Sequence, residues 1–150
     1  MAIPLPPFMH RALALAQAAA DAGEVPVGAV ITKDGVEIAA AANRMRAAQD
    51  PTAHAEIEAI RAAARVLGND RLEGCDLWVT LEPCPMCAGA IAHARLARVY
   101  YAAPDPKSGG VDHGPRIFSQ STCHHRPEVY SGLGGDLAAA QLRAFFSNRR

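Results

Sequence analysis

The chain lacks the features of a membrane-spanning or exported protein. It has no apolar run near the ~18 residues of a membrane span and no basic N-terminal region that would begin an export signal. Cysteines are scarce, with four among 150 residues, and Cys84 and Cys87 form a CxxC pair. That spacing favours a metal site over disulfides, so we expect a reduced, soluble, cytoplasmic protein without a membrane partner.

Excess charge of one sign is also absent, since 15 Lys and Arg balance 15 Asp and Glu. A net charge of zero by itself argues against a polyanionic partner. The distribution is uneven, however, because residues 1–90 carry 7 basic and 11 acidic side chains whereas residues 91–150 carry 8 and 4. Such asymmetry can guide a polyanion to one face, although a solvated surface with uneven charge explains it as well.

Interdomain linkers, internal repeats and low-complexity tracts are absent too, and half of the residues are apolar. A chain of this length and composition predicts a single domain over residues 1–150. Residues 8–22 are rich in Ala and Leu and are followed by a glycine, which predicts a helix. Residues 27–32 and 36–42 flank an Asp-Gly step and predict an antiparallel β-hairpin.

Helices and strands alternate through the rest of the chain. Apolar residues 77–81 and 98–102 predict two further strands, and residues 43–53 predict a loop. The remaining helices are expected from about 52 to 68 with Asp50 or Thr52 as the cap, from 84 to 94, and from 136 to 146. Residues 103–135, rich in Pro, Gly, Ser and His, predict an ordered functional loop with a helical turn at 116–119. This order predicts a layered α/β fold.

Two short motifs, HAE at 54–56 and PCPMC at 83–87, hold the residues best suited to bind a transition metal. Cys84 and Cys87 lie three positions apart at a predicted helix start, so both sulfurs face one side, and helix N–H groups favour their thiolate forms. His54 supplies a third ligand from the start of another helix, because such folds place ligands at the carboxyl ends of strands. The three residues predict a zinc site with an open fourth position that holds water.

Glu56 is better suited to carry protons than to bind the metal. It lies two residues after His54, about 200° around an ideal helix, so it does not duplicate the contact of the histidine. A carboxylate beside the open position can move the protons of the bound water, which favours hydrolytic chemistry. A structural zinc site, completed by a fourth protein ligand, is the alternative at this point.

The chain resembles the zinc-dependent nucleoside and nucleobase deaminases, whose HxE and PCxxC motifs supply the zinc ligands and the catalytic acid. Within them it is most similar to the bacterial tRNA-specific adenosine deaminases. The segments that carry this likeness span nearly the whole chain, and they are EVPVGAVI at 24–31, TAHAEI at 52–57, TLEPCPMCAGAI at 80–91 and DPKSG at 105–109. The resemblance implies a three-layer α/β/α sandwich with a central mixed five-stranded sheet, of the cytidine-deaminase type.

The resemblance also implies an activity, the hydrolytic deamination of the wobble adenosine to inosine in a tRNA anticodon stem-loop. His54, Cys84 and Cys87 would bind one Zn²⁺ per subunit, and Glu56 would take a proton from the activated water and return protons to the ring and the departing amine. Unpaired loop bases cost less to extrude than paired ones, which favours a loop substrate. An arginine tRNA, a homodimer and the absence of an organic cofactor are further expectations from the resemblance.

Four polar residues are expected, by resemblance, to contact the RNA. Asn43 matches the asparagine that ends the second strand in the family and is expected to hydrogen-bond the nucleoside. Asp105, Lys107 and Ser108 match a loop, expected after the fifth strand, that holds RNA beside the pocket. Lys107 suits a phosphate, and the other two suit sugar or base edges. Taken alone, the DPKSG segment favours an ordinary polar turn over an RNA contact, and Asn43 is also common in turns.

The likeness is weaker over residues 110–132, where no particular RNA contact is predicted. Cys123, His124 and His125 favour packing or RNA contact over a second metal, because three adjacent side chains point in different directions. Other notable side chains are assigned to the core or to the last helix, namely Cys75, Trp78 and Met86 to the core, and Phe145 and Phe146 to helix packing or base stacking.

Two other functions fit parts of the sequence. A small-molecule deaminase of the guanine or cytosine type would share the zinc residues, but it needs neither an RNA-binding loop nor a basic final third. A zinc-stabilised RNA-binding module without catalysis would need the zinc ligands and not Glu56. Activity on an anticodon stem-loop, and the dependence of that activity on Glu56, distinguish the three.

Overall fold

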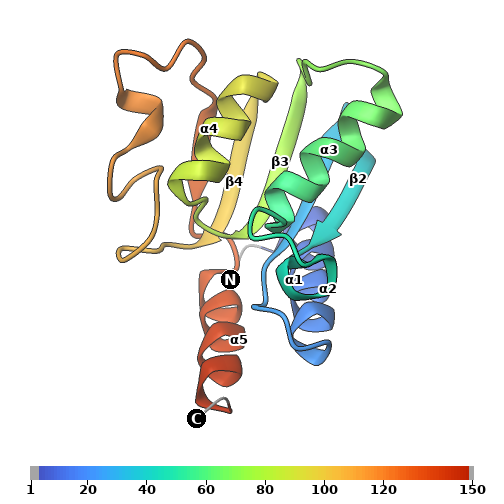
Figure 1. The fold of residues 1–150 in the computed structure, drawn as a ribbon, viewed down its shortest axis with the longest axis vertical. Coiled ribbons are helices and arrows are strands. Elements are labelled where there is room, and N and C mark those ends of the chain that lie inside the picture. The colour runs from blue at the N-terminus through green and yellow to red at the C-terminus, as the bar shows by residue number, and fades with distance from the viewer. Residues whose placement is uncertain (1–3, 149–150) are drawn as a thin grey trace.

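The computed structural model describes residues 4–148 and contains a five-stranded sheet with helices packed on it (Figure 1). The elements, in chain order, are α1 (Pro7–Asp21), β1 (Gly28–Lys33), β2 (Val36–Ala42), α2 (Met45–Ala48), α3 (Ala55–Leu67), β3 (Cys75–Leu81), α4 (Pro85–Ala94), β4 (Arg98–Ala103), the 3₁₀ turn η1 (Ile117–Ser119), β5 (Glu128–Ser131) and α5 (Gly135–Ser147). No helix within residues 4–148 is both long and apolar enough to cross a membrane.

The sheet is mixed, and its strands lie in the order β2-β1-β3-β4-β5. β1 pairs antiparallel with β2 and β3, whereas β4 pairs parallel with β3 and β5. The predicted hairpin is confirmed, because Asp34 and Gly35 join β1 to β2 with φ angles of 51° and 76°. An Asp-Gly pair tolerates this left-handed backbone better than most residues do, so the sequence determines the turn.

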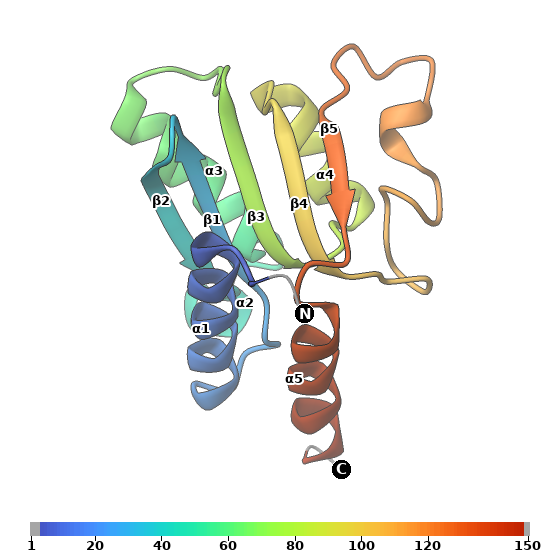
Figure 2. The ribbon, with the colours of Figure 1, turned by 180° about the vertical axis from the view of Figure 1, so that it is seen from behind.

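Helices cover the sheet on both faces. Figures 1 and 2 show α3 and α4 on one face and α1 on the other, with α5 extending beyond the end of the sheet beside α1. A 2.9 Å hydrogen bond from the Gln141 side chain to the Leu13 carbonyl joins these last two helices. The arrangement confirms the predicted α/β/α sandwich.

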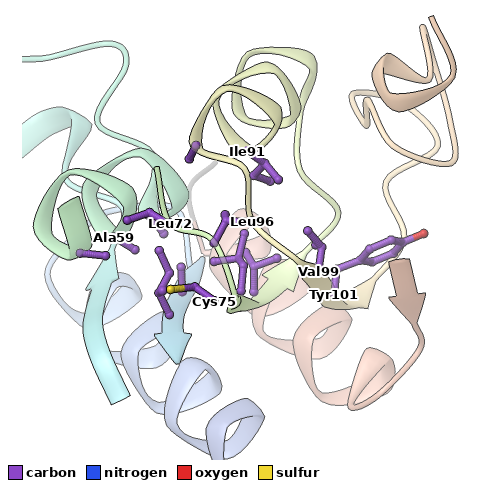
Figure 3. Packing of buried hydrophobic residues seen from close by; sticks show 14 of the residues in the cluster. Ala59, Leu72, Cys75, Ile91, Leu96, Val99 and Tyr101 are labelled. Carbon is purple, nitrogen blue, oxygen red and sulfur yellow. The ribbon is translucent and has the colours of Figure 1, made fainter. Parts of the chain in front are cut away.

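The larger hydrophobic core lies between the sheet and the pair α3 and α4 (Figure 3). The residues that Figure 3 labels are buried side chains from both layers, namely Ala59, Leu72, Cys75, Ile91, Leu96, Val99 and Tyr101. Cys75 has no exposed surface, which confirms its assignment to the core. Each fully buried Leu, Ile or Val contributes about 1.5–3 kcal/mol, so this core holds the starts of α3 and α4 in fixed positions.

Several local features differ from the sequence prediction. β5 lies inside the segment that was expected to be a loop, and the DPKSG loop follows β4, the fourth strand in the chain, rather than the fifth. The short helix α2 lies within predicted loop 43–53. β5 escapes prediction because it is a mostly exposed strand of four residues with little apolar alternation.

Two residues expected in the core are partly exposed. Met86 keeps 38% of its surface accessible because it lies in the exposed first turn of α4. Trp78 is half-buried on the face of the sheet that carries α1, where its ring stacks on Tyr100 with centroids 3.9 Å apart. Trp78 therefore packs against other side chains, as expected, but it is not fully buried.

Candidate active site

Three strand ends meet at one edge of the sheet, and the polar residues of interest follow them. The register pairs Ala42 with Gly28 and Leu81 with Ala103, so β2, β3 and β4 all finish at this edge. Asn43 and α3 follow β2, whereas α4 follows β3. The edge therefore brings together residues that lie far apart in the chain, as the layered fold predicts.

The structure brings His54, Cys84 and Cys87 together at this edge. Nδ1 of His54 lies 3.6 Å from Sγ of Cys84 and 3.5 Å from Sγ of Cys87. Zinc–nitrogen and zinc–sulfur bonds of about 2.0 and 2.3 Å at a tetrahedral angle place their ligand atoms about 3.5 Å apart. The spacing and the soft N and S donors therefore fit a tetrahedral zinc ion with three protein ligands.

Helix geometry explains why these cysteines can serve as thiolates. Cys84 is the N-cap of α4 and Cys87 lies in its first turn, where backbone N–H groups point outward. A hydrogen bond from the Cys87 thiol, together with one from His54, lowers the pKa of Cys84 to about 4. The shared proton and burial raise the pKa of Cys87. Thiolates are the forms that bind metal, so a divalent cation held by both cysteines would displace the remaining thiol proton.

Glu56 lies in the first turn of α3 and is almost fully buried, with 4% of its surface exposed. Burial raises its pKa to about 7, and the neighbouring Cys84 charge adds to the rise. Within residues 4–148, the groups of His, Cys, Asp and Glu that can hold a metal comprise one set, formed by His54 and the two cysteines, and Glu56 is outside it. A carboxyl group with a pKa near neutrality is suited to accept and return protons.

A cavity of about 160 Å³ opens beside these residues. Its apolar wall is formed by the side chains of Val25, Val27, Met45 and Leu81. Its polar wall is formed by Asn43, His54, Glu56, Glu82, Cys84, Asp105 and Ser108. A cavity that combines apolar side chains with converging polar groups is typical of a small-molecule binding site.

Asn43 borders the cavity, and its side chain also caps the start of α3. Its Oδ1 accepts the backbone N–H of Ala55 at 2.8 Å, and its Nδ2 donates to the Val25 carbonyl at 3.1 Å. The side-chain cap therefore comes from Asn43 rather than from Asp50 or Thr52, which hydrogen-bond each other. An amide has two donors and two lone pairs, so Asn43 keeps one of each for a ligand.

The DPKSG loop is distributed unevenly about the cavity. Asp105 and Ser108 line it, whereas Lys107 is exposed and lies outside the lining. Oδ1 of Asp105 accepts the backbone N–H groups of Lys107 at 3.2 Å and Ser108 at 2.9 Å. The loop is thus a polar turn whose two ends face the cavity, and its contacts with RNA stay a prediction.

Glu82 is a cavity residue that the sequence reasoning missed. Its side chain has no exposed surface and accepts several hydrogen bonds from residues 105–113. Burial alone would raise its pKa, but the hydrogen bonds from Asp105, His113 and neighbouring amides outweigh it and lower the pKa. An acidic residue directly after the apolar run 77–81 was the available sequence feature.

The second-metal hypothesis at Cys123, His124 and His125 finds no support, since the metal-binding group found within residues 4–148 does not include them. The Cys123 thiol donates to the His125 carbonyl at 3.1 Å, and the His125 ring bonds the Leu96 carbonyl at 2.7 Å. These contacts fix the long loop against the body of the domain. The packing interpretation is therefore favoured.

The fold and the His/Cys/Cys site are those of a zinc-dependent deaminase. Residues 5–103 match the family model of the cytidine and deoxycytidylate deaminase zinc-binding region, and the chain belongs to this family. Zinc is accordingly the cofactor that the three side chains fit.

The relatives narrow the class to the tRNA-specific adenosine deaminases. The enzyme of this name from Agrobacterium fabrum is 55% identical to this chain, and the match covers 95% of this chain and 94% of the relative. The enzyme from Bacillus subtilis is 41% identical, and the match covers 95% of this chain and 89% of the relative. A solved structure from work on A-to-I editing by tRNA:A34 deaminases superposes with a TM-score of 0.89 at 56% identity, over 90% of this chain and 98% of that one. The structure of a guanine deaminase from Nitrosomonas europaea superposes with a TM-score of 0.77 at 26% identity, over 97% of this chain and 87% of that one.

Proposed function

We propose that this chain hydrolyses the 6-amino group of the wobble adenosine in a tRNA anticodon stem-loop, leaving inosine and ammonia. One observation carries the proposal: a buried acid, Glu56, lies in a small cavity beside a His/Cys/Cys group for which residues 4–148 supply no fourth protein ligand. The high identity to tRNA-specific adenosine deaminases selects the substrate among those that this chemistry could serve.

His54, Cys84 and Cys87 are assigned as the ligands of one zinc ion per subunit. When bound, zinc lowers the pKa of a coordinated water from about 15.7 to about 7. The Glu56 carboxylate takes one proton from the attacking water and delivers it to N1 of adenine. It then takes the remaining proton of the hydroxyl added at C6, as the carbonyl forms, and delivers it to the amino group, which leaves as ammonia. The apolar wall of the cavity, which includes Val27 and Leu81, holds the base and limits access of bulk water.

The RNA contacts are assigned to the rim of the cavity. Asn43 has one free donor and one free acceptor, which suit the nucleoside. Asp105 and Ser108 line the cavity and suit sugar or base edges, whereas exposed Lys107 suits a phosphate outside it. An unpaired anticodon base reaches such a cavity at lower cost than a base in a stem, because no pair must be broken.

Further features of the proposal rest on the family resemblance. We propose an arginine-accepting tRNA as the substrate, a homodimer as the assembly, and the cytoplasm as the compartment in which tRNA is modified. We propose no organic cofactor, because Glu56 and the three metal ligands together supply the hydrolytic chemistry.

An assay with a synthetic anticodon stem-loop tests the proposal. We expect one adenosine, at the wobble position, to gain about one dalton as an amine becomes a carbonyl. A stem-loop with guanosine at that position is the matched control and should stay unchanged. Consumption of free guanine or cytidine without inosine in the RNA would instead establish the small-molecule alternative, which the likeness to a guanine deaminase keeps open.

A further inference from the structure

Glu82 is a buried carboxylate that the proposed chemistry does not use. Its Oε1 accepts the backbone N–H of Asp105 at 3.0 Å and the ring Nδ1–H of His113 at 2.7 Å. Its Oε2 accepts the backbone N–H groups of Val111, Asp112 and His113 at 3.2, 3.0 and 3.1 Å. All five donors belong to residues 105–113, which we call the anchor loop.

The anchor loop is also pressed against the start of α4. The Gly110 N–H donates to the Pro83 carbonyl at 2.8 Å, and a Cβ at Gly110 would lie 2.6 Å from the Pro85 nitrogen. A Cβ at Gly109 would collide with the Glu82 carboxylate itself. Glycine at both positions thus permits a close approach that any other side chain would prevent.

A chain of hydrogen bonds leads from Glu82 to the cavity rim. Glu82 holds the backbone of Asp105, and the Asp105 carboxylate in turn holds the backbone of Ser108 at 2.9 Å. Asp105 and Ser108 both line the cavity that contains Glu56. The position of the rim therefore depends on one carboxylate that lies behind it.

We infer that Glu82 is a positioning residue for the RNA substrate: it fixes the anchor loop so that Asp105 and Ser108 meet the anticodon loop, while proton transfer depends on Glu56. The inference rests on the proposed function, because it assigns the anchor loop to RNA. It adds a residue that neither touches the reacting atoms nor binds the metal.

The chemistry of the side chain explains why a carboxylate is needed. Five N–H donors converge on the two oxygens of Glu82, and an ionised carboxylate is acceptor-only. A glutamine has the same size but would turn an NH₂ group either toward the backbone N–H of Asp105 or toward the three backbone N–H groups of 111–113, and only the His113 ring can change tautomer to accept from it. The anchor loop would then have to move, since buried N–H groups without acceptors are costly.

The test compares Glu82→Gln with the wild-type protein on the stem-loop. We expect KM to rise by roughly tenfold or more and kcat to stay within about threefold, because only substrate positioning is lost. Zinc content should be unchanged, and hydrogen exchange at the amides of 111–113 should be faster. His113→Ala, which removes a single bond to Glu82, is the milder variant and should raise KM less.

Two comparisons separate positioning from general destabilisation. Leu72→Ala removes a fully buried side chain near the opposite end of α4, and it should lower thermal stability without raising KM. Ser108→Ala should raise KM in the wild-type background and have little effect in the Glu82→Gln background, because its contact is already lost. Independent, multiplicative effects would indicate that Glu82 does not act through the loop.

Each outcome has a distinct meaning. Wild-type protein that leaves the stem-loop unedited would overturn the proposed function, and the inference with it. Edited RNA together with an unchanged KM in Glu82→Gln would overturn the inference alone. If Glu82→Gln does not fold, His113→Ala decides, since an unchanged KM in that folded variant contradicts a role for the Glu82–His113 anchor.

Discussion

Glu56 combines near-complete burial with a position beside a metal-binding group. It is 4% exposed, and burial is the main reason that its pKa rises to about 7. An exposed carboxylate would stay ionised at neutral pH and would return protons poorly. The Glu56 side chain is therefore suited to the proton transfers that we propose.

Replacement of Glu56 by glutamine should remove catalysis and keep the site. Glutamine preserves the size of the side chain but cannot exchange a proton, so kcat on the stem-loop should fall by about 10²–10⁴-fold. Zinc content, measured by atomic absorption, and RNA affinity should stay near wild-type values because the ligands and the rim are untouched.

Glu58→Gln is the matched control, since Glu58 lies in the same first turn of α3 and outside the cavity lining. It should edit the stem-loop at the wild-type rate. Wild-type turnover in Glu56→Gln would mean that another group moves the protons, and the role assigned to Glu56 would be withdrawn.

Lys107 is exposed beside the cavity rim, which suits a contact with a phosphate rather than with the base. Lys107→Ala should weaken binding and reduce the slope of log affinity against log salt by about 0.7, the contribution of one phosphate on single-stranded RNA. Lys33→Ala is the control, because Lys33 is equally exposed at the end of β1 that lies away from the cavity. Equal slopes of log affinity against log salt for the two variants would mean that Lys107 does not contact a phosphate.

Among the elements, α3 depends on a residue outside itself. Its N-cap is His54, whose side chain makes no capping bond, and the free N–H of Ala55 is satisfied by Asn43 at the end of β2. This bond joins a strand end to a helix start across 12 residues of chain. It fixes the helix turn that carries both His54 and Glu56.

Loss of this bond should lower stability. Asn43→Ala removes a cap worth about 1 kcal/mol, which corresponds to a fall in Tm of about 2–4 °C for a chain of this size. Thr52→Ala should have a smaller effect, because the Thr52 hydroxyl donates to the loop residue Asp50 and does not cap the helix. Calorimetry of the two variants measures both Tm values. A larger fall in Tm for Thr52→Ala would indicate that Thr52 caps α3, as the sequence predicted.

The sequence predicts elements whose determinants are local. The Asp34-Gly35 hairpin and the CxxC at the start of α4 follow from neighbouring residues, and the structure contains both. Glu82 could not be found in this way, because its partners lie 23 to 31 residues further along the chain. β5 was missed for a related reason, since pairing with β4 holds it and its own four residues show little pattern.

At the scale of the whole molecule, the hydrophobic core and the metal site are neighbours with separate roles. The core between the sheet and α3 and α4 includes fully buried Leu77, Ile91 and Val99, none of which lines the cavity. Small zinc domains lack such a core and unfold without metal. Here the sheet holds the two helix starts in place, and a zinc ion bound by His54, Cys84 and Cys87 would connect them.

Removal of zinc should therefore abolish activity without unfolding the protein. Zinc that binds only the folded state at 100 times its Kd adds about 2.7 kcal/mol, which corresponds to roughly 5–10 °C in Tm for a chain of this size. After chelation we expect an unchanged far-UV circular dichroism spectrum, a cooperative unfolding transition shifted downward by about that amount, and editing restored by added Zn²⁺. A random-coil spectrum in the metal-free protein would show that the core cannot hold His54, Cys84 and Cys87 together, and the separation of core and site would be wrong.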